Sequence, residues 1–216
     1  MNDFGSAGLW ICCDGVEGAG KTTLATALAR RLTATIAPEF SMSPTGQALR
    51  AAVQTSPHYI ATSTWGQSLA FIGDFHETFE STVMPALAKG AIVISDRGWL
   101  SKYAYQAQVL SNTFARSETD RRLFQLLDMP RMPDITFYLD AETDVLAARL
   151  QERDGSCTPD RIEFIKGARD CYERFVRRTG ETGFPSLRVV QLGSLSREAT
   201  LSGALSTLEG MGVTAR

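Results

Sequence analysis

Short apolar runs alternate with longer segments of mixed polarity along this chain of 216 residues. Five of these runs predict buried strands, at positions 9–13, 33–37, 91–95, 135–139 and 188–192. Apolar residues spaced three and four apart predict helices at 22–32, 65–88, 141–152, 161–177 and 196–208. Because strands and helices alternate, we expect a single α/β domain over residues 1–216, built on a five-stranded parallel sheet flanked by helices.

The turn between the first strand and the first helix carries a phosphate-binding pattern. It reads Gly15-Val16-Glu17-Gly18-Ala19-Gly20-Lys21-Thr22, which is a glycine, four residues and then Gly-Lys-Thr. In such a loop the backbone N–H groups surround a polyphosphate, the lysine reaches the terminal phosphates and the threonine hydroxyl can hold Mg²⁺. The helix that starts at Thr22 and Thr23 would point its N-terminal dipole at the same phosphates. The loop predicts a nucleotide-phosphate site but does not identify the reaction.

A second candidate feature follows the apolar run 91–95, which ends in Asp96-Arg97. In an open parallel sheet, ligands bind at the carboxyl ends of the strands. We therefore expect Asp96 and Arg97 to lie near the phosphate-binding loop. There the carboxylate could hold a water of Mg²⁺, and the arginine could bridge a donor and an acceptor phosphate. A surface ion pair at a strand end is the alternative interpretation.

Composition narrows the class of protein. Hydrophobic residues make up 44% and charged residues 21% of the chain, as in an ordinary soluble domain, and the formal charge of −2 disfavours a nucleic-acid-binding surface. No segment has the pattern of a signal peptide or of a membrane span. The four cysteines lack metal-ligand spacing and are best interpreted as packing residues in a reducing compartment. We expect a cytoplasmic protein with neither a nucleic-acid nor a membrane partner.

Four motifs, taken in order, give the chain a family resemblance. The first runs from Asp14 to Thr23, and the second is Phe71-x-x-Asp74, followed by Pro85-Ala86-Leu87 and Gly90 before Asp96-Arg97. The third is Ser101-Lys102-Tyr103-Ala104-Tyr105-Gln106. The fourth is Pro133-Asp134 before a strand ending at Asp140, with Asp160-Arg161-Ile162-Glu163 further on. The chain resembles the thymidylate kinases among the P-loop nucleoside monophosphate kinases. The resemblance implies a P-loop kinase fold, ATP and Mg²⁺, a nucleoside monophosphate acceptor with dTMP as the first choice, and a homodimer.

The resemblance also implies roles for residues around the two phosphates. By position, Lys21, Thr22 and the loop backbone would hold the phosphates of ATP, and Thr22 and Asp96 would serve Mg²⁺. Arg97 would contact the acceptor monophosphate, and Arg50 lies where the family often keeps another substrate-binding arginine.

For the nucleoside part of the acceptor, the resemblance implies four contacts. Glu17 would bind the 3′-hydroxyl of the deoxyribose, and Tyr105 would crowd the 2′ position. Phe71 would stack on the base, and Gln106 would hydrogen-bond its edge. Without the resemblance, aromatic and polar residues at such helical positions would be interpreted as core and surface residues.

The polar segment 153–160 lies between two predicted helices and contains glycine, serine and proline. This composition predicts a mobile lid. Because Gly18 stands where some relatives keep an arginine, the resemblance implies that the catalytic arginine comes from the lid. We assign that role to Arg153, with Arg149 one turn earlier as the substitute, and expect Arg161 to flank the lid at the ATP site.

Several departures from the family pattern fall in the acceptor site. Phe75 stands where the family has an arginine that donates to the thymine carbonyl, and Lys102 occupies a position that is usually small and polar. Gly98 replaces a tyrosine or histidine, and the segment 38–41 lacks the family's arginine. Either Lys102 supplies a replacement donor, or the acceptor is another base, such as a 5-substituted dUMP against an apolar wall formed by Phe75.

Three other functions compete with the leading one. A deoxynucleoside kinase also has an acidic residue and arginine after its third strand, but the Ser-x-x-Ala-Tyr-Gln motif favours a monophosphate kinase. A GTPase needs Asn-Lys-x-Asp, and the only two asparagines, Asn2 and Asn112, lie in other contexts. A non-catalytic nucleotide-binding protein remains the alternative from a different class.

Overall fold

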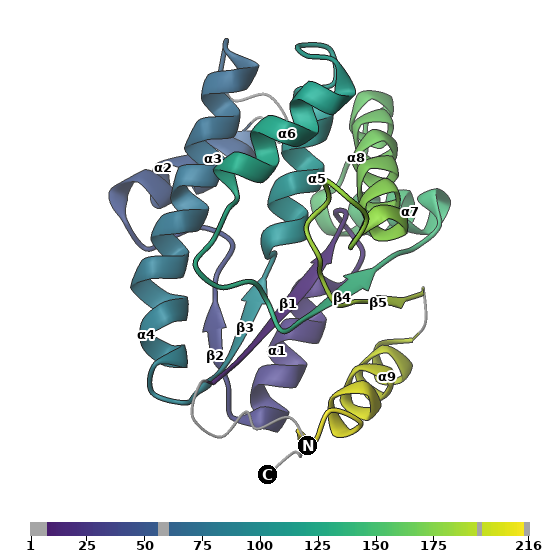
Figure 1. The fold of residues 1–216 in the computed structure, drawn as a ribbon. Coiled ribbons are helices and arrows are strands. Elements are labelled where there is room, and N and C mark those ends of the chain that lie inside the picture. The colour runs from purple at the N-terminus through teal and green to yellow at the C-terminus, as the bar shows by residue number, and fades with distance from the viewer. Residues whose placement is uncertain (1–7, 56–60, 194–195, 214–216) are drawn as a thin grey trace.

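A five-stranded sheet forms the centre of the protein (Figure 1), whose computed structural model describes residues 8–55, 61–193 and 196–213. The strands are β1 (Leu9–Gly15), β2 (Thr35–Ala37), β3 (Ile92–Asp96), β4 (Ile135–Leu139) and β5 (Val189–Leu192). All pairings are parallel, and the order across the sheet is β2-β3-β1-β4-β5. The predicted five-stranded parallel sheet is therefore confirmed.

The order of the strands places a crevice at the end of β1. This strand pairs with β3 on one side and β4 on the other, so the chain changes direction across the sheet at β1. Cys13 lies opposite Asp96 of β3, which brings the loop after β1 and the residues after β3 to the same edge. Ligands of open α/β sheets bind at such a reversal of strand order.

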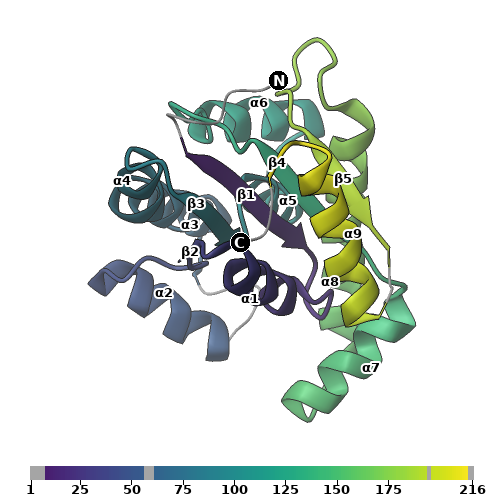
Figure 2. The same cartoon turned by 90° about the horizontal axis from the view of Figure 1, so that it is seen from below.

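Helices cover both faces of the sheet. Figure 2 shows α1 and α9 on one side, and α3 to α6 on the other. The helical elements are α1 (Lys21–Leu32), α2 (Pro44–Thr55), α3 (Thr64–Thr78), a π-helical segment η1 (Phe79–Val83), α4 (Met84–Leu87), α5 (Trp99–Val109), α6 (Arg116–Leu126), α7 (Thr143–Asp154), α8 (Pro159–Arg178) and α9 (Arg197–Glu209).

The predicted helix 65–88 is confirmed in its extent, because α3, η1 and α4 follow one another without a gap, but the π-helical segment η1 interrupts its regular α-helical turns. The N–H of Met84 bonds to the carbonyl oxygen of Phe79, five residues back. Pro85, the next residue, has no N–H to give, and its ring would crowd the preceding turn of a regular α-helix. The wider π turn accommodates the proline, so the distortion lies in the turn before Pro85.

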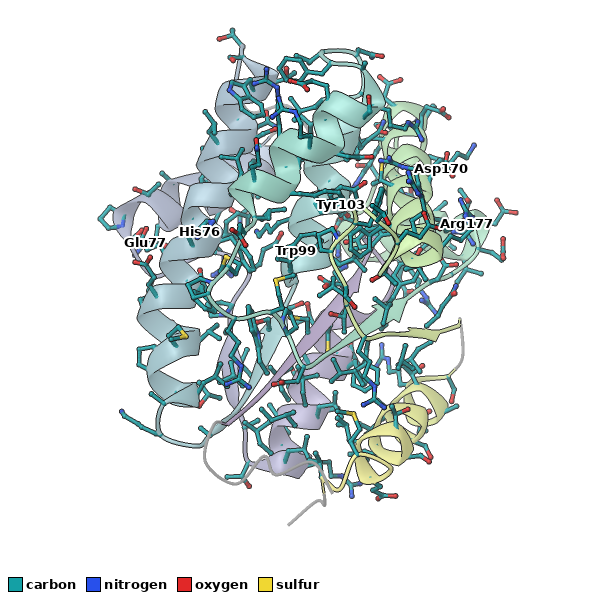
Figure 3. All side chains as sticks on the ribbon, viewed as in Figure 1. His76, Glu77, Trp99, Tyr103, Asp170 and Arg177 are labelled. Carbon is teal, nitrogen blue, oxygen red and sulfur yellow. The ribbon has the colours of Figure 1, made fainter. Side chains whose placement is uncertain are left out.

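One face of α5 is held by a cluster of aromatic rings. Trp99 and Tyr103 lie in the interior of the molecule (Figure 3), with ring centroids 5.9 Å apart, and both pack on Phe124 of α6 and Phe175 of α8. The Tyr103 hydroxyl also donates to the buried Asp120. These contacts fix the position of α5, which also carries residues of the candidate site described below. Within the described ranges, no helix is long and apolar enough to cross a membrane.

Candidate active site

The loop between β1 and α1 has the conformation that its glycines allow. Gly15, Gly18 and Gly20 all have positive φ angles, and a Cβ on Gly15 would overlap the carbonyl oxygen of Leu139. Gly20 immediately precedes α1, so the first N–H groups of this helix point at the loop. Such an arrangement binds anions through backbone N–H groups and the helix dipole.

Lys21 is held inside the phosphate-binding loop. Its ammonium donates to the carbonyl oxygen of Val16 over 2.7 Å, and the side chain is buried. Burial first, and then the neighbouring Arg97 guanidinium, lower the pKa of Lys21 to about 7, while Asp96 opposes the shift. The site is therefore short of negative charge, which a polyphosphate would supply.

Thr22, in the first turn of α1, lies next to Asp96, at the end of β3. The Thr22 hydroxyl donates to Oδ2 of Asp96 over 2.7 Å. A hydroxyl and a carboxylate side by side suit Mg²⁺, which prefers oxygen ligands and usually takes one or two carboxylates together with substrate phosphates. The described residues contain no cluster of three or more acidic, histidine or cysteine side chains that could hold a metal alone.

Arg97 adopts an unusual backbone conformation, with φ at 71°. Its guanidinium donates to the carbonyl oxygen of Gly15 over 3.2 Å and pairs with Glu39 over 3.0 Å. It also lies 4.8 Å from the centre of the Tyr105 ring. These contacts point the arginine along the loop toward the acceptor side.

Asp14 connects the loop to the start of α5, a role that sequence reasoning missed although Asp14 belongs to the first motif. Its Oδ1 accepts the N–H of Gly98 over 2.7 Å, and both the N–H and the hydroxyl of Ser101. The hydroxyl of Tyr172 on α8 lies 2.7 Å from Ser101 Oγ and 3.1 Å from the Gly15 oxygen. Burial raises the pKa of Asp14, and the hydrogen bonds oppose this shift. This network positions the loop against α5 and α8.

A cavity of about 800 Å³ opens beside the loop, between α3, α5 and the segment after α7. Phe71 from α3 and Lys102, Tyr105 and Gln106 from α5 line it, together with Arg97. Its wall also includes Phe164 of α8, whose ring lies 6.0 Å from that of Tyr105. The cavity thus gathers most of the residues that the sequence placed around an acceptor nucleotide.

Two of the predicted acceptor residues lie elsewhere. Arg50 is exposed on α2 and is not among the residues that line the cavity. Phe75 is only 3% exposed and packs in the hydrophobic core, so it does not form the apolar wall expected for it. It comes four positions after Phe71 on α3, yet of the two only Phe71 lines the cavity.

The segment 38–41, which stands in place of the family's arginine segment, contributes Glu39 to the wall of this cavity. The buried Asp74 accepts the N–H and the hydroxyl of Ser41, with the shorter bond at 2.6 Å. This anchor holds Glu39 against Arg97. It also holds Phe40 near Phe71, with the two ring centroids 6.0 Å apart. The Phe71-x-x-Asp74 motif therefore supplies both a cavity wall and the support for the opposite segment.

A second cavity, of about 900 Å³, lies on the other side of the loop. Residues 18 to 23 of the loop and α1 line it, with Leu139 of β4 and the start of α9. Arg149 also lines it and donates to the carbonyl oxygen of Gly18 over 3.2 Å. Arg153 lines both cavities.

The non-helical part of the predicted lid, 153–160, is shorter in the structure. Helix α7 continues to Asp154, and α8 begins at Pro159, so Arg153 is helical and 155–158 is the connection. Gly155 ends α7 in the left-handed conformation, which stops the helix at this point. The Thr158 side chain caps α8 by accepting the N–H of Arg161.

Arg161 links the lid segment to the phosphate-binding loop. Its guanidinium pairs with Glu17 over 2.6 Å and with Asp154 over 2.8 Å. Asp154 also takes two hydrogen bonds from Arg153, whose side chain is 58% exposed. Together these bonds lower the pKa of Asp154 to about 2. Glu17, the predicted partner of a deoxyribose hydroxyl, is thus engaged with Arg161 in this structure.

Comparison with known proteins identifies this arrangement. Residues 13–184 match the family model for thymidylate kinase. A probable thymidylate kinase of Methanosarcina acetivorans is 32% identical over 187 residues, which cover 78% of this chain and 86% of the relative. The fold is similar to a crystal structure of thymidylate kinase from Ehrlichia chaffeensis, with a TM-score of 0.69, 21% identity and coverage of 94% and 99% of the two chains. It is also similar to thymidylate kinase from Candida albicans, with a TM-score of 0.74, 17% identity and coverage of 95% and 93%. The chain belongs to the thymidylate kinase family.

Proposed function

We propose that the protein transfers the γ-phosphoryl group of ATP to dTMP. The observation that carries this proposal is the pair of cavities on either side of the phosphate-binding loop, with Arg153 lining both. A donor nucleotide in the cavity beside α9 and an acceptor in the cavity beside α5 would meet at Lys21 and Arg97. The family membership supports the same donor and acceptor.

Phosphoryl transfer needs positioning and charge neutralisation rather than a covalent protein intermediate. The loop backbone and Lys21 would hold the donor phosphates, and Arg97 would hold the acceptor phosphate beside them. Mg²⁺, held by Thr22 and Asp96, would neutralise charge on the donor phosphates when bound. Arg153 would add a further positive charge from the lid, where closure would exclude water.

The acceptor cavity has a place for each part of a deoxynucleotide. Phe71 and Tyr105 both line this cavity, where Phe71 would stack on the base and Tyr105 would crowd a ribose 2′-hydroxyl. Glu17 would bind the 3′-hydroxyl after exchanging its contact with Arg161. Arg149 and Arg161 would help to hold the lid over the donor, while the exposed Arg50 would reach the acceptor only after a movement of α2.

The test is ADP release with a panel of acceptors: dTMP, 5-hydroxymethyl-dUMP, dGMP, UMP and thymidine. We expect dTMP to give the highest kcat/KM, and Lys21→Ala to lower turnover about 100-fold or more, because a charge aimed at the transferred phosphate is lost. Lys89→Ala, an exposed lysine after α4, is the matched control. Preference for thymidine, a purine or a ribonucleotide would contradict the proposal, as would full activity of Lys21→Ala.

The family membership also supports a homodimer, and the four free cysteines suit the reducing cytoplasm as the location. Sedimentation equilibrium of the purified protein would test the first, with a mass of two chains expected. Localisation of a tagged chain in its own cell would test the second.

A further inference from the structure

Helix α5 presents two buried polar side chains to the acceptor cavity. Lys102 and Gln106 are four residues apart, so they lie on the same face of the helix, and each is only 4% exposed. They line the cavity together with Phe71 of α3. Long polar side chains are rarely buried this far unless something pairs with them.

The ammonium of Lys102 is held between aromatic rings and has donor capacity to spare. It donates to the carbonyl oxygen of Glu39 over 3.2 Å, and it lies 5.4 Å from the ring centre of Phe40 and 5.9 Å from that of Phe71. An ammonium carries three N–H donors and can accept no hydrogen bond. A ligand base next to Phe71 would therefore need an acceptor atom facing Lys102.

Gln106 supplies the complementary group. Its Oε1 is buried, and no described residue donates to it. A buried acceptor without a donor is costly, so an N–H group of a ligand would relieve this cost. Because the Gln amide can turn over, Gln106 adapts to its partner, whereas Lys102 can only donate.

On the basis of the function proposed above, we propose that Lys102 and Gln106 together read the edge of a pyrimidine-2,4-dione base. Lys102 donates to the carbonyl oxygen at position 4, and Gln106 accepts the N–H at position 3. The family resemblance implies an arginine at position 75 for the base carbonyl, but Phe75 is buried in the core here. The cationic donor has therefore moved from α3 to α5, across the cavity.

This arrangement excludes cytosine. A cytosine base carries an amino group at position 4 and an unprotonated nitrogen at position 3, so it would turn a donor toward the ammonium of Lys102. Rotation of the Gln106 amide could satisfy the ring nitrogen but could not relieve the meeting of two donors at Lys102. The specificity for a dione base thus depends on Lys102 more than on Gln106.

The experiment compares dTMP with 5-methyl-dCMP, which differs from dTMP only at positions 3 and 4 of the ring. Binding of each nucleotide is measured by calorimetry and its phosphorylation by ADP release, for the wild type, Lys102→Met and Gln106→Leu. Lys89→Met is the control for the same substitution at an exposed site. The wild type should favour dTMP at least about 10-fold, and Lys102→Met should lose about 10- to 100-fold of its affinity for dTMP, as for a hydrogen bond to a charged group.

The ratio between the two nucleotides decides the outcome. We expect Lys102→Met to lower dTMP binding while changing 5-methyl-dCMP binding little, so that the discrimination collapses. Gln106→Leu should weaken dTMP binding with a smaller change in the ratio. An unchanged ratio of dTMP to 5-methyl-dCMP binding in a folded Lys102→Met protein would overturn the inference. Equal use of the two nucleotides by the wild type would also overturn it, and that measurement does not depend on any variant folding. If the wild type releases no ADP with either nucleotide, the proposed function itself fails. That result differs from a failure of the inference alone, in which ADP is released from both.

Discussion

The backbone of Arg97 allows a test of strain at the site. Its φ of 71° lies in the left-handed region, which Thr33 is the only other non-glycine residue of the described chain to enter. The conformation is enforced from both sides, because the N–H of Arg97 bonds to the Cys13 oxygen and that of Gly98 to Asp14. The turn redirects the chain from β3 into α5 and aims the guanidinium at the loop.

The perturbation is a pair of variants, Arg97→Ala and Arg97→Gly. Both remove the guanidinium, but only glycine removes the steric cost of the left-handed conformation, about 1–2 kcal/mol. Glycine's larger entropy in the unfolded chain offsets about 0.4–1 kcal/mol of this gain. We therefore expect the free energy of unfolding of Arg97→Gly to exceed that of Arg97→Ala by about 1 kcal/mol.

The assay is urea unfolding of both variants, and the expected difference corresponds to about 2–4 °C in Tm for a chain of this size. The matched control is Arg50→Ala against Arg50→Gly, at an exposed position inside α2. There the order should reverse, because glycine costs a helix about 1 kcal/mol relative to alanine. Both Arg97 variants should lose about 100-fold or more in turnover.

Two results would refute this reasoning. If Arg97→Ala is as stable as Arg97→Gly while the Arg50 pair behaves as expected, the backbone at Arg97 carries no strain. If either Arg97 variant keeps the turnover of the wild type, the arginine does not act on the transferred phosphate. A strained residue at a functional site is expected where the surrounding bonds fix its conformation.

Three further predictions concern other parts of the site. Arg153→Ala should lower turnover about 100-fold, more than Arg149→Ala or Arg161→Ala in the same steady-state assay, and a reversed ranking would move the catalytic role to the more sensitive arginine. Burial lowers the pKa of Lys102, so the unfolded chain holds this proton more tightly than the folded one. The free energy of unfolding should therefore rise with pH between the folded and the ordinary pKa of lysine, and urea titrations of Lys102→Met should lack this rise. Gly98→Ala should lower the free energy of unfolding in urea by about 1–3 kcal/mol, because a Cβ at this position would overlap the side chain of Cys12. Wild-type stability of this variant would contradict the packing.

The features that sequence predicted well are local ones. An apolar run, a glycine-rich turn and a helix stand next to one another in the chain, so the phosphate-binding loop could be predicted from a few consecutive residues. The alternation of strands and helices then implied the parallel sheet, and parallel strands necessarily bring Asp96 and Arg97 to the edge where the loop lies.

Sequence reasoning failed where the pattern depends on distant partners. Helix α2 was not predicted, because it buries only Gly46 and Leu49 and so shows a weak apolar stripe. Helix α6 is mostly polar, and its buried Asp120 is explained by two distant partners: Tyr103 of α5, which donates to it, and Arg174 of α8, whose guanidinium lies 2.6 Å away. Neither helix can therefore be predicted from the pattern of its own residues.

The position of Phe75 shows the same limit inside the site. Spacing from Phe71 placed it one helical turn further along α3, which is correct, but spacing alone cannot tell which side of α3 meets the cavity. The segment with Glu39 contributes to the cavity wall and is itself held by Asp74. The side chain at 75 is thereby left to the core.

The departures from the family pattern form one connected set rather than independent changes. Glu39 pairs with Arg97 through its carboxylate and with Lys102 through its carbonyl oxygen, so the segment that replaced the family's arginine now holds two of the cations that line the acceptor cavity. An arginine returned to position 75 alone would be buried in the core, where an unpaired charge is strongly disfavoured. A tyrosine returned to position 98 alone would meet the packed end of β1. Each residue is thus compatible with its present neighbours and not with the family residue, which explains how the site can move its donor from α3 to α5 and leave the phosphate-binding loop unchanged.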